Sequence, residues 1–331
     1  WEKLVKIGSR HLVLPTIYCR LKQKALINVL PNDLNNYLLE LTQINRNRNT
    51  AIFGQVKELS SLLRQQNIEH VFLKGIALIS ANYFEDRGER MIGDIDILVK
   101  ETQLKEAASL LLRNNYEHKP STFGKKYFEY HHDECLISKD GGLAPVELHR
   151  YILHSHYDKF LISQNILSNK ENHHDIFIPS KYHILENIIL NSEINDYGYM
   201  YNTIGIRNMY DYICSTNNIS KNILESLFKT SKFHALFIKK THFYFNKFEG
   251  FNLTNNQHPI FYCFILTQKK VLLKKVQNYW VNFRILVTIT VERVKLFILN
   301  PNYRNEAWKD RKRIQKLFFI KLFIYFYPFT F

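Results

Sequence analysis

The sequence predicts an α+β fold, with a mixed sheet between two mainly helical segments. Two observations predict this class. Apolar residues follow helical spacing up to about residue 66, and short alternating runs then follow. Beyond residue 180 the strand signal fades and helical spacing returns. The 331 residues are enough for more than one domain. We expect a helical N-terminal segment over 1–51, a sheet-containing domain over 52–150 and a mainly helical, basic domain over 151–331.

The first elements follow from prolines and helical spacing. Pro15 and Pro31 divide residues 1–50 into a few helices, because proline interrupts a helix interior. Asn47–Asn49 predicts a further break, and a helix over Ile52–Gln66 follows it.

Short strands and helices then alternate. The sequence predicts a strand over His70–Leu73, a helix over Ile76–Tyr83, a loop over Glu85–Gly93 and a strand over Asp94–Lys100. A helix capped by Thr102 and a hairpin follow, the hairpin with strands over 125–138 and Ala144–Arg150 around the turn Asp140–Gly142. Later helices are expected over Ser180–Glu193, Ile206–Cys214, Ser220–Lys229 and Trp280–Ile298.

Composition describes a globular chain with a substantial core, since 46% of residues are hydrophobic and 23% are charged. The four cysteines form no C-x-x-C pair, which argues against a zinc knuckle or a disulfide framework. We therefore expect a reduced, cytoplasmic location. The most apolar stretch, Phe318–Phe331, is shorter than the roughly 20 residues that span a bilayer and contains Lys321, so no integral membrane segment is predicted.

The net charge of +15 is concentrated in the last third of the chain. Residues 1–220 contain 25 basic and 25 acidic residues, whereas residues 221–331 contain 20 and 5. One interpretation is a surface for RNA or another polyanionic acceptor, and the other is a solubilising surface. Aromatic residues between Lys239, Lys240 and Lys247 favour the first, because such interleaving is typical of single-strand binding.

Asp94 and Asp96 form the sharpest local motif. In a strand they share one face, while Ile95 and Ile97 lie on the other. Two carboxylates side by side repel each other and are stable with a cation between them or with one shared proton. Hard divalent cations prefer such oxygen ligands. The motif therefore indicates a candidate metal site.

Glu147 and His149 share a strand face in the same way, with Val146 and Leu148 opposite. If this strand lies beside the Asp94–Lys100 strand, three carboxylates converge, which is enough for two Mg²⁺ ions. The alternative for Glu147 is a salt-bridged strand residue. For His149 we expect a hydrogen bond to the ligands rather than a catalytic role.

Lys74, Gly75 and Arg90 are candidate phosphate-binding residues. Lys74-Gly75 ends a strand and opens a helix, where glycine allows close approach and lysine provides a charge. Arg90, four residues before Asp94, has the planar fork that fits phosphate oxygens.

The segments VFLKGIALISANYF, ERMIGDIDILV and PVELHR resemble the uncharacterised bacterial nucleotidyltransferases (nucleotidyltransferase family 5) of the DNA polymerase beta-like superfamily. The resemblance is strong over about 70–150 and continues more weakly through Ile206–Asp211. It implies a palm-like domain with a mixed sheet, two Mg²⁺ ions, which Mn²⁺ can replace, and transfer of a nucleoside monophosphate from an NTP. By position it implies that Asp94, Asp96 and Glu147 hold the metals and that Lys74 and Gly75 meet the triphosphate.

The sequence departs from the superfamily in two respects. The usual Gly-Ser or Gly-Gly pair is Lys74-Gly75 here, and the spacing from Gly75 to Asp94 is longer than in simple members. Toxins of the same superfamily that act on tRNA share a Lys-Gly pair upstream of an arginine and a D-x-D motif. A binding module of the same fold that no longer turns over is a further hypothesis. Arg207 and Asp211, four residues apart on a predicted helix, form either a salt bridge or, through Arg207, a nucleotide contact.

Overall fold

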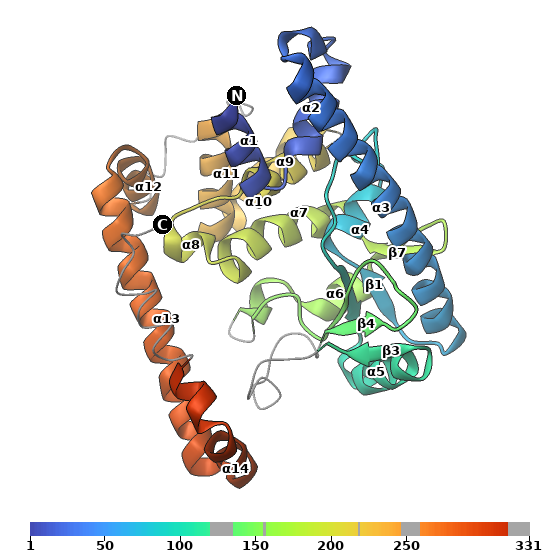
Figure 1. Cartoon of the computed structure of the whole chain (residues 1–331), viewed down its shortest axis with the longest axis vertical. Helices are drawn as coiled ribbons and strands as arrows, with labels where there is room; N and C mark the ends of the chain where they lie inside the picture. The colour runs from blue at the N-terminus through green and yellow to red at the C-terminus, as the bar shows by residue number, and fades with distance from the viewer. Residues whose placement is uncertain (120–134, 155–156, 218, 246–258, 317–331) are drawn as a thin grey trace. The chain divides into compact units, whose positions relative to one another are not determined.

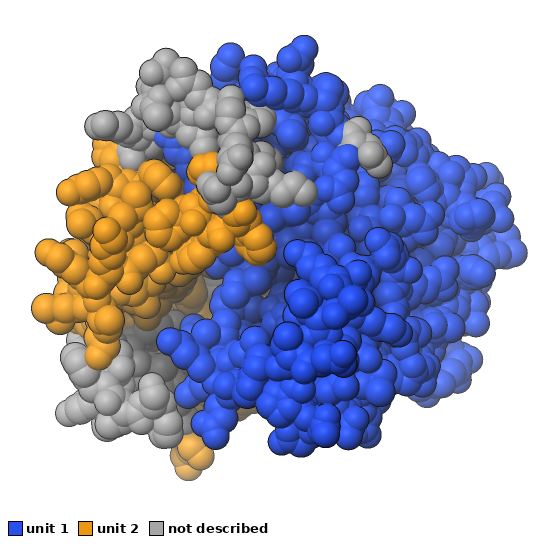
Figure 2. Space-filling view, turned by 90° about the horizontal axis from the view of Figure 1, so that it is seen from above, with its two compact units in different colours: residues 1–119, 130–196, 204–241 blue, residues 120–129, 197–203, 242–331 orange. Residues whose placement is uncertain are grey.

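The computed structural model describes the chain except residues 120–134, 155–156, 218, 246–258 and 317–331. Its described part combines helices with a five-stranded mixed sheet, which confirms the predicted α+β class (Figure 1). The chain divides into two compact units (Figure 2). Unit 1 comprises residues 1–119, 130–196 and 204–241, and unit 2 comprises residues 120–129, 197–203 and 242–331. The predicted division after residues 51 and 150 stays a prediction.

The five strands of unit 1 lie in the order β1-β2-β5-β4-β3. The strands are β1 (His70–Phe72), β2 (Ile95–Val99), β3 (Tyr116–His118), β4 (Leu136–Ser138) and β5 (Val146–His149). β2 and β5 run parallel, and the other neighbouring pairs are antiparallel. Most of the predicted strand over 125–138 lies outside the described residues, and β4 is its described end. The sequence did not indicate β3, because only one of its three residues is a buried apolar one.

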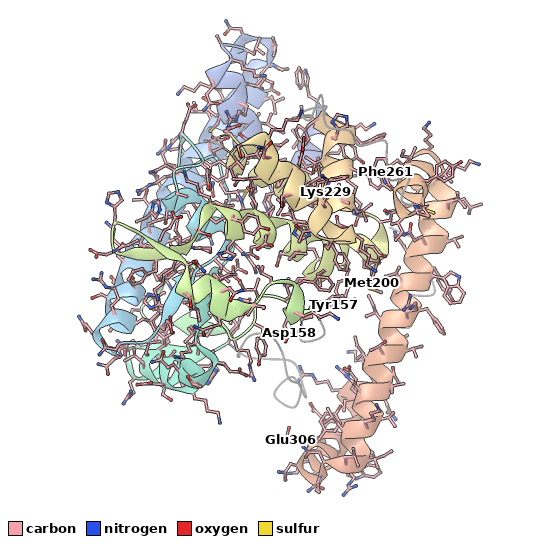
Figure 3. All side chains as sticks on the ribbon, turned by 180° about the vertical axis from the view of Figure 1, so that it is seen from behind. Tyr157, Asp158, Met200, Lys229, Phe261 and Glu306 are labelled. Atoms are coloured by element: carbon pink, nitrogen blue, oxygen red, sulfur yellow. The ribbon has the colours of Figure 1, made fainter. Side chains whose placement is uncertain are left out.

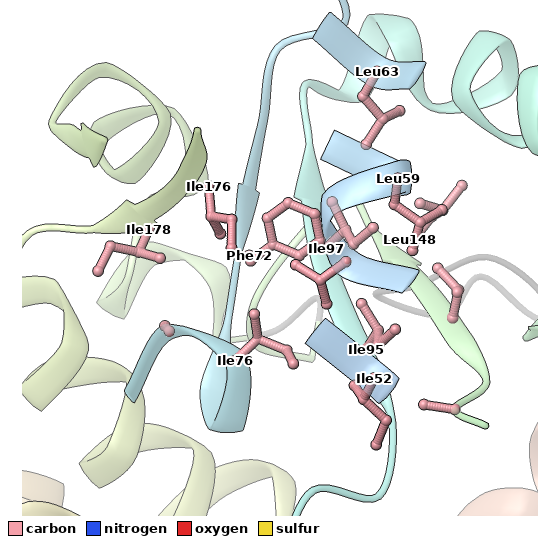
Figure 4. Packing of buried hydrophobic residues seen from close by; sticks show 14 of the residues in the cluster. Ile52, Leu59, Leu63, Phe72, Ile76, Ile95, Ile97, Leu148, Ile176 and Ile178 are labelled. Atoms are coloured by element: carbon pink, nitrogen blue, oxygen red, sulfur yellow. The ribbon is translucent and has the colours of Figure 1, made fainter. Parts of the chain in front are cut away.

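Strand β2 belongs to the main hydrophobic core of unit 1, and all five of its residues are buried. Ile95 and Ile97 cluster with Leu148 of β5 and with side chains of the long helix α3 (Asn32–Gln65), including Ile52 and Leu59 (Figure 4). Burying a side chain of this size contributes about 1.5–3 kcal/mol. The apolar half of β2 therefore fixes the position of the polar residues on the same strand.

Helix α3 (Asn32–Gln65) is continuous over 34 residues. The predicted break at Asn47–Asn49 is therefore wrong. Asn45 and Asn49 are buried, and their amides donate hydrogen bonds to backbone carbonyls of the loop before β2. Because these amides have partners outside the helix, they do not compete for its own backbone groups. The asparagine-rich stretch consequently stays helical.

Two shorter helices precede α3, namely α1 (Glu2–Arg10) and α2 (Leu14–Gln23). Pro15 lies in the first turn of α2, and Pro31 directly precedes α3. Proline is tolerated at these positions because the first turn of a helix has unpaired N–H groups in any case. The prediction that both prolines separate helices is confirmed. Side chains from this region form a smaller core of Leu14, Tyr18, Cys19, Leu30, Leu34 and Leu38.

The helices predicted for the remainder of unit 1 are present. They are α4 (Lys74–Ser80), α5 (Leu104–Arg113), α7 (Lys181–Leu190), α9 (Ile206–Ser215) and α10 (Lys221–Thr230). Thr102 does not cap α5, contrary to prediction, because a 3₁₀-helix over Glu101–Gln103 precedes that helix. Unit 1 also contains α6 (Ser163–Ser168), the hairpin β6 (Lys170–His173) and β7 (Ile176–Pro179), and a π-helix (Asn191–Asn195). Helix α11 (Lys232–Phe245) belongs to unit 1 up to residue 241.

The described residues of unit 2 form helices. These are α8 (Gly198–Tyr201), α12 (Pro259–Lys269), α13 (Val271–Leu299) and α14 (Pro301–Lys309). The helix predicted through Trp280–Ile298 is confirmed within α13. Asn300 caps α14, since its side chain accepts hydrogen bonds from the backbone of Asn302 and Tyr303. Among the described helices, none has both the length and the apolar character that a bilayer span requires. The apolar stretch Phe318–Phe331 lies outside the described residues, so this finding does not apply to it.

Candidate functional site

Strands β2 and β5 bring carboxylates from two distant parts of the sequence together. In their parallel register Asp96 lies opposite Glu147. Asp96 is 1% exposed, whereas Glu147 is half-buried. Both interrupt alternating apolar residues that pack into the core. The structure therefore places the two carboxylates side by side, which meets the condition that the strand patterns left open.

Asp96, Glu147 and His149 form a group of suitable size for a metal ion. One ligand atom of each lies within 4.8 Å of the other two. His149 Nε2 lies 2.8 Å from Asp96 Oδ1 and 3.7 Å from Glu147 Oε2. Carboxylate oxygens suit Mg²⁺ and Mn²⁺. The donor set therefore fits a divalent cation, with His149 placed either to bind it or to orient Asp96.

Asp94 lies one residue before β2 and is half-buried. It stands outside the three-residue group. Burial raises the pKa of Asp94, and the charge of Asp96 raises it further, while Lys74 lowers it. Such an environment favours a cation beside the ionised carboxylate. The predicted ligand set of Asp94, Asp96 and Glu147 stays a prediction.

Lys74 begins α4, and its Nζ donates a hydrogen bond to Asp96 Oδ1 at 2.6 Å. Burial alone would lower the pKa of Lys74, but the attraction of Asp96 raises it. Burial alone would likewise raise the pKa of Asp96, whereas Lys74 and His149 hold it below its usual range. The Lys74 backbone has a φ of 49°, a conformation that non-glycine residues adopt at a cost. Lys74 therefore balances the charge of the most buried carboxylate.

Gly75 lies where a side chain would crowd its neighbours. A Cβ atom there would be 3.3 Å from Ile92 Cγ1 and 3.9 Å from Arg90 Nη1. The glycine therefore allows α4 to approach the loop that carries Arg90. Its predicted contact with a triphosphate stays a prediction.

Arg90 forms an ion pair with an aspartate 121 residues further along the chain. Its Nε lies 2.8 Å from Oδ1 and 3.0 Å from Oδ2 of Asp211, and both side chains are buried. The predicted salt bridge between Arg207 and Asp211 is wrong, because Asp211 faces Arg90 instead. The predicted contact of Arg90 with phosphate stays a prediction.

Three residues that no motif indicated hold the loop that carries Arg90. Asn49 donates to two carbonyls of this loop at 2.6 and 2.8 Å, and Asn45 donates to a third at 2.7 Å. Thr16 Oγ1 of α2 donates to the Glu89 carbonyl at 2.8 Å. The i, i+4 spacing of Asn45 and Asn49 was the available signal, since it places both amides on one helix face.

The side chain of Glu89 joins this loop to α2 and α9. It is fully buried, and its Oε1 lies 3.0 Å from Arg20 Nε. The hydroxyl of Tyr210, on α9, donates a hydrogen bond to the same oxygen. Burial raises the pKa of Glu89, while Tyr210 and Arg20 oppose that rise. The N-terminal helices and α9 thus fix the residue next to Arg90 from two sides.

A small cavity of about 50 Å³ lies beside Lys74. Its wall includes three cationic side chains, Lys74, Arg90 and Arg207, and one carboxylate, that of Asp211. Two larger hollows, of about 580 and 750 Å³, contain none of the predicted site residues. The carboxylate group and the cationic cavity therefore meet at Lys74.

The basic segment after residue 220 differs in part from the predicted nucleic-acid surface. Lys239 and Lys240 are buried, and Lys240 Nζ pairs with the buried Glu193 at 2.9 Å. These two lysines therefore do not offer a surface for a single-stranded nucleic acid, contrary to the prediction from the alternation of basic and aromatic residues. Lys247 lies outside the described residues. Lys229, in the last turn of α10, is exposed (Figure 3).

The chain shares similarity with a solved structure and with a protein family. The chain is similar to a solved structure, an antigenic nucleotidyltransferase-like protein from Paracoccidioides brasiliensis, with 16% sequence identity and a TM-score of 0.41. The similarity covers 60% of this chain and 89% of that chain. No curated protein matches. The uncharacterised nucleotidyltransferase family matches residues 1–212, which include the N-terminal helices as well as the motif segments. The chain therefore belongs to the uncharacterised nucleotidyltransferase family.

Proposed function

We propose that the chain transfers a nucleoside monophosphate from an NTP to an acceptor hydroxyl or phosphate and releases pyrophosphate. The observation that carries this proposal is the register of β2 and β5, in which Asp96 lies opposite Glu147. Asp94, two residues before Asp96, has the strand spacing that shares its face. Family membership supports the reaction class.

Asp94, Asp96 and Glu147 are the proposed ligands of two Mg²⁺ ions, for which Mn²⁺ can substitute. Bound ions of this kind neutralise phosphate charge and activate an attacking hydroxyl. His149 is placed to orient Asp96, because its Nε2 lies 2.8 Å from Asp96 Oδ1. Orientation matters here, since metal ligands that rotate freely bind less well.

Lys74 and Gly75 are the proposed contacts of the triphosphate. The Lys74 ammonium already lies beside the carboxylate group, within reach of a phosphate bound there. Gly75 lets the backbone of α4 approach closely. Arg90 adds positive charge on the same side, although Asp211 occupies its Nε. The phosphates and the reacting centre are thus assigned to neighbouring parts of one site.

The acceptor is the least constrained part of the proposal. The 20 basic and 5 acidic residues of 221–331 favour an anionic acceptor, and RNA, including tRNA, is the first to test. The same excess favours the second candidate function, an RNA-binding module that no longer turns over.

The test is to incubate the protein with each α-labelled NTP, Mg²⁺, total RNA and cell lysate, and to identify the fraction that becomes labelled. Asp94→Asn and Glu147→Gln should reduce labelling at least a hundredfold, because both substitutions remove a ligand charge. Glu117→Gln is the matched control, since Glu117 is an exposed carboxylate on β3 of the same sheet.

Full labelling by Asp94→Asn would contradict the proposal. Absence of labelling by the wild-type protein, together with salt-sensitive RNA binding that does not depend on Mg²⁺, would support the binding module instead.

A further inference from the structure

Arg207 is a partly buried cation that forms no close ion pair with a described carboxylate, although Asp211, Asp196 and Asp94 lie near enough to attract it. It lies in the first turn of α9 and is half-buried. Asp211, the acid one turn further on, is bound to Arg90 through both of its oxygens. Within the described part of the chain, Arg207 has no carboxylate within 4.0 Å. Burial lowers the pKa of Arg207, and the nearby charge of Arg90 lowers it further, although the charges of Asp211, Asp196 and Asp94 oppose that shift. An anion at this position would relieve both effects.

The cavity beside Arg207 is suited to a small anion. Its volume is about 50 Å³. A space of this size suits a small anionic group such as one phosphoryl group. Asn187 also lines it, is buried, and has no hydrogen-bond partner for its Oδ1 among the described residues. Rotation of that carboxamide presents two N–H donors in place of the oxygen.

Lys74 links this cavity to the carboxylates. It contacts Asp96 and also lines the cavity that contains Arg207. Cations therefore continue from the candidate metal ligands through Lys74 to Arg207. A triphosphate whose α-phosphate lies at the carboxylates extends in this direction, because its remaining charges favour the cations.

We propose that Arg207 binds the terminal phosphate of the NTP and makes the site selective for triphosphates over monophosphates. This inference rests on the proposed function and assigns the phosphate end of that site. Arginine suits this role because its planar fork forms two parallel hydrogen bonds to phosphate oxygens.

The experiment measures binding of the four NTPs and the four NMPs, with Mg²⁺ and without acceptor, by isothermal titration calorimetry. Arg207→Gln should weaken binding of the preferred NTP at least tenfold, because it removes charge-assisted hydrogen bonds. Binding of the matching NMP should change less than twofold. Tripolyphosphate should compete with the NTP on the wild-type protein and much less on the variant. Arg113→Gln, on the exposed face of α5, is the matched control.

Arg207→Lys keeps the charge without the fork, so it should give an intermediate loss and tests the inference if Arg207→Gln does not fold. Unchanged NTP affinity in a folded variant, or equal losses for NTP and NMP, would overturn the role of Arg207. If either of these results is found for the Arg207 variant while the wild-type protein transfers nucleotide, the role of Arg207 is refuted and the proposed function stands. If the wild-type protein binds no NTP and transfers none, both proposals fail.

Discussion

Lys74 Nζ lies 2.6 Å from Asp96 Oδ1, so a lysine neutralises the most buried of the three candidate metal-binding carboxylates. Asp96 Oδ1 also lies 2.8 Å from His149 Nε2. A divalent cation at Asp96 would repel the Lys74 ammonium, because like charges at this range raise each other's free energy. Lys74 and the metal are therefore expected to compete for Asp96 until a triphosphate provides the lysine with another anion.

Lys74→Met should bind Mn²⁺ several-fold more tightly than the wild-type protein when no nucleotide is present. The variant removes the competing charge while keeping an apolar stem of similar length. Titration followed by electron paramagnetic resonance of free Mn²⁺ measures the affinity. Lys105→Met, at an exposed position of α5, is the control and should leave the affinity unchanged. An unchanged or weaker affinity in Lys74→Met would show that the lysine and the metal do not compete.

Asp211→Ala should lower the free energy of unfolding by about 3–5 kcal/mol, because it leaves Arg90 buried without its counter-charge. Urea denaturation measures the change. Asp175→Asn, which removes the charge of the exposed partner of Arg64 and tolerates the φ of 67° at this position, should cost less than about 1 kcal/mol. Replacing both Arg90 and Asp211 by apolar residues should recover much of the loss, since no unpaired charge then remains. A loss below that of the Asp175 control would refute the assigned importance of the pair.

Asn49→Ala should lower the free energy of unfolding by about 1–3 kcal/mol, because two carbonyls of the loop before β2, one of them buried, lose their donor. Nucleotide transfer should fall as well, since that loop leads to Asp94. Asn47→Ala is the control on the same helix, and its side chain is exposed. The comparison uses urea denaturation and the labelling assay at a temperature where both variants are folded. Equal behaviour of the two variants would contradict the role of Asn49.

His70 should make the protein less stable as the pH falls below about 6.5. Burial lowers the pKa of His70 from 6.5 to about 4, although its hydrogen bond to the Ile68 carbonyl opposes that shift. Between these two values the unfolded chain binds a proton that the folded chain does not, so unfolding becomes easier at lower pH. The free energy of unfolding is expected to fall by about 1.4 kcal/mol per pH unit in this range, and no loss is expected above the pKa of His70 in the unfolded chain.

The His70→Gln variant lacks this titration, so its urea midpoint should depend less on pH between 6.5 and 5 than that of the wild-type protein. Both proteins are compared at pH 7.5 as well, where the contribution of His70 to the pH dependence has ended. Parallel pH profiles for the two proteins would argue against a neutral, buried His70.

The strands that carry the candidate ligands could be predicted because their signal is local. Asp96 and Glu147 each lie between apolar residues at a period of two, and this pattern also fixes which face is buried. The pattern could not predict that the two strands are neighbours, since no local rule decides which strands pair. It predicted only that the carboxylates would converge if they were. The structure satisfies that condition through the parallel register of β2 and β5.

Other features could not be predicted because they depend on distant partners. Asn45 and Asn49 looked like a helix break, and only the loop that their amides contact explains why the helix continues. Asp211 pairs with Arg90 rather than with its helical neighbour, which sequence spacing cannot show. The β6 strand was missed because its residues, Lys170–His173, are polar.

The pairing of Arg90 with Asp211 also bears on how the chain folds. It raises the contact order of the site, because α9 must return to a loop 121 residues earlier before the loop charge is compensated. A fragment that ends after β5 would retain the paired strands but would lack α9, so Arg90 would have no counter-charge and the core around it would be incomplete. The shortest chain expected to fold with an intact site therefore extends to Asp211, which lies just inside the C-terminal limit of the family match at residue 212.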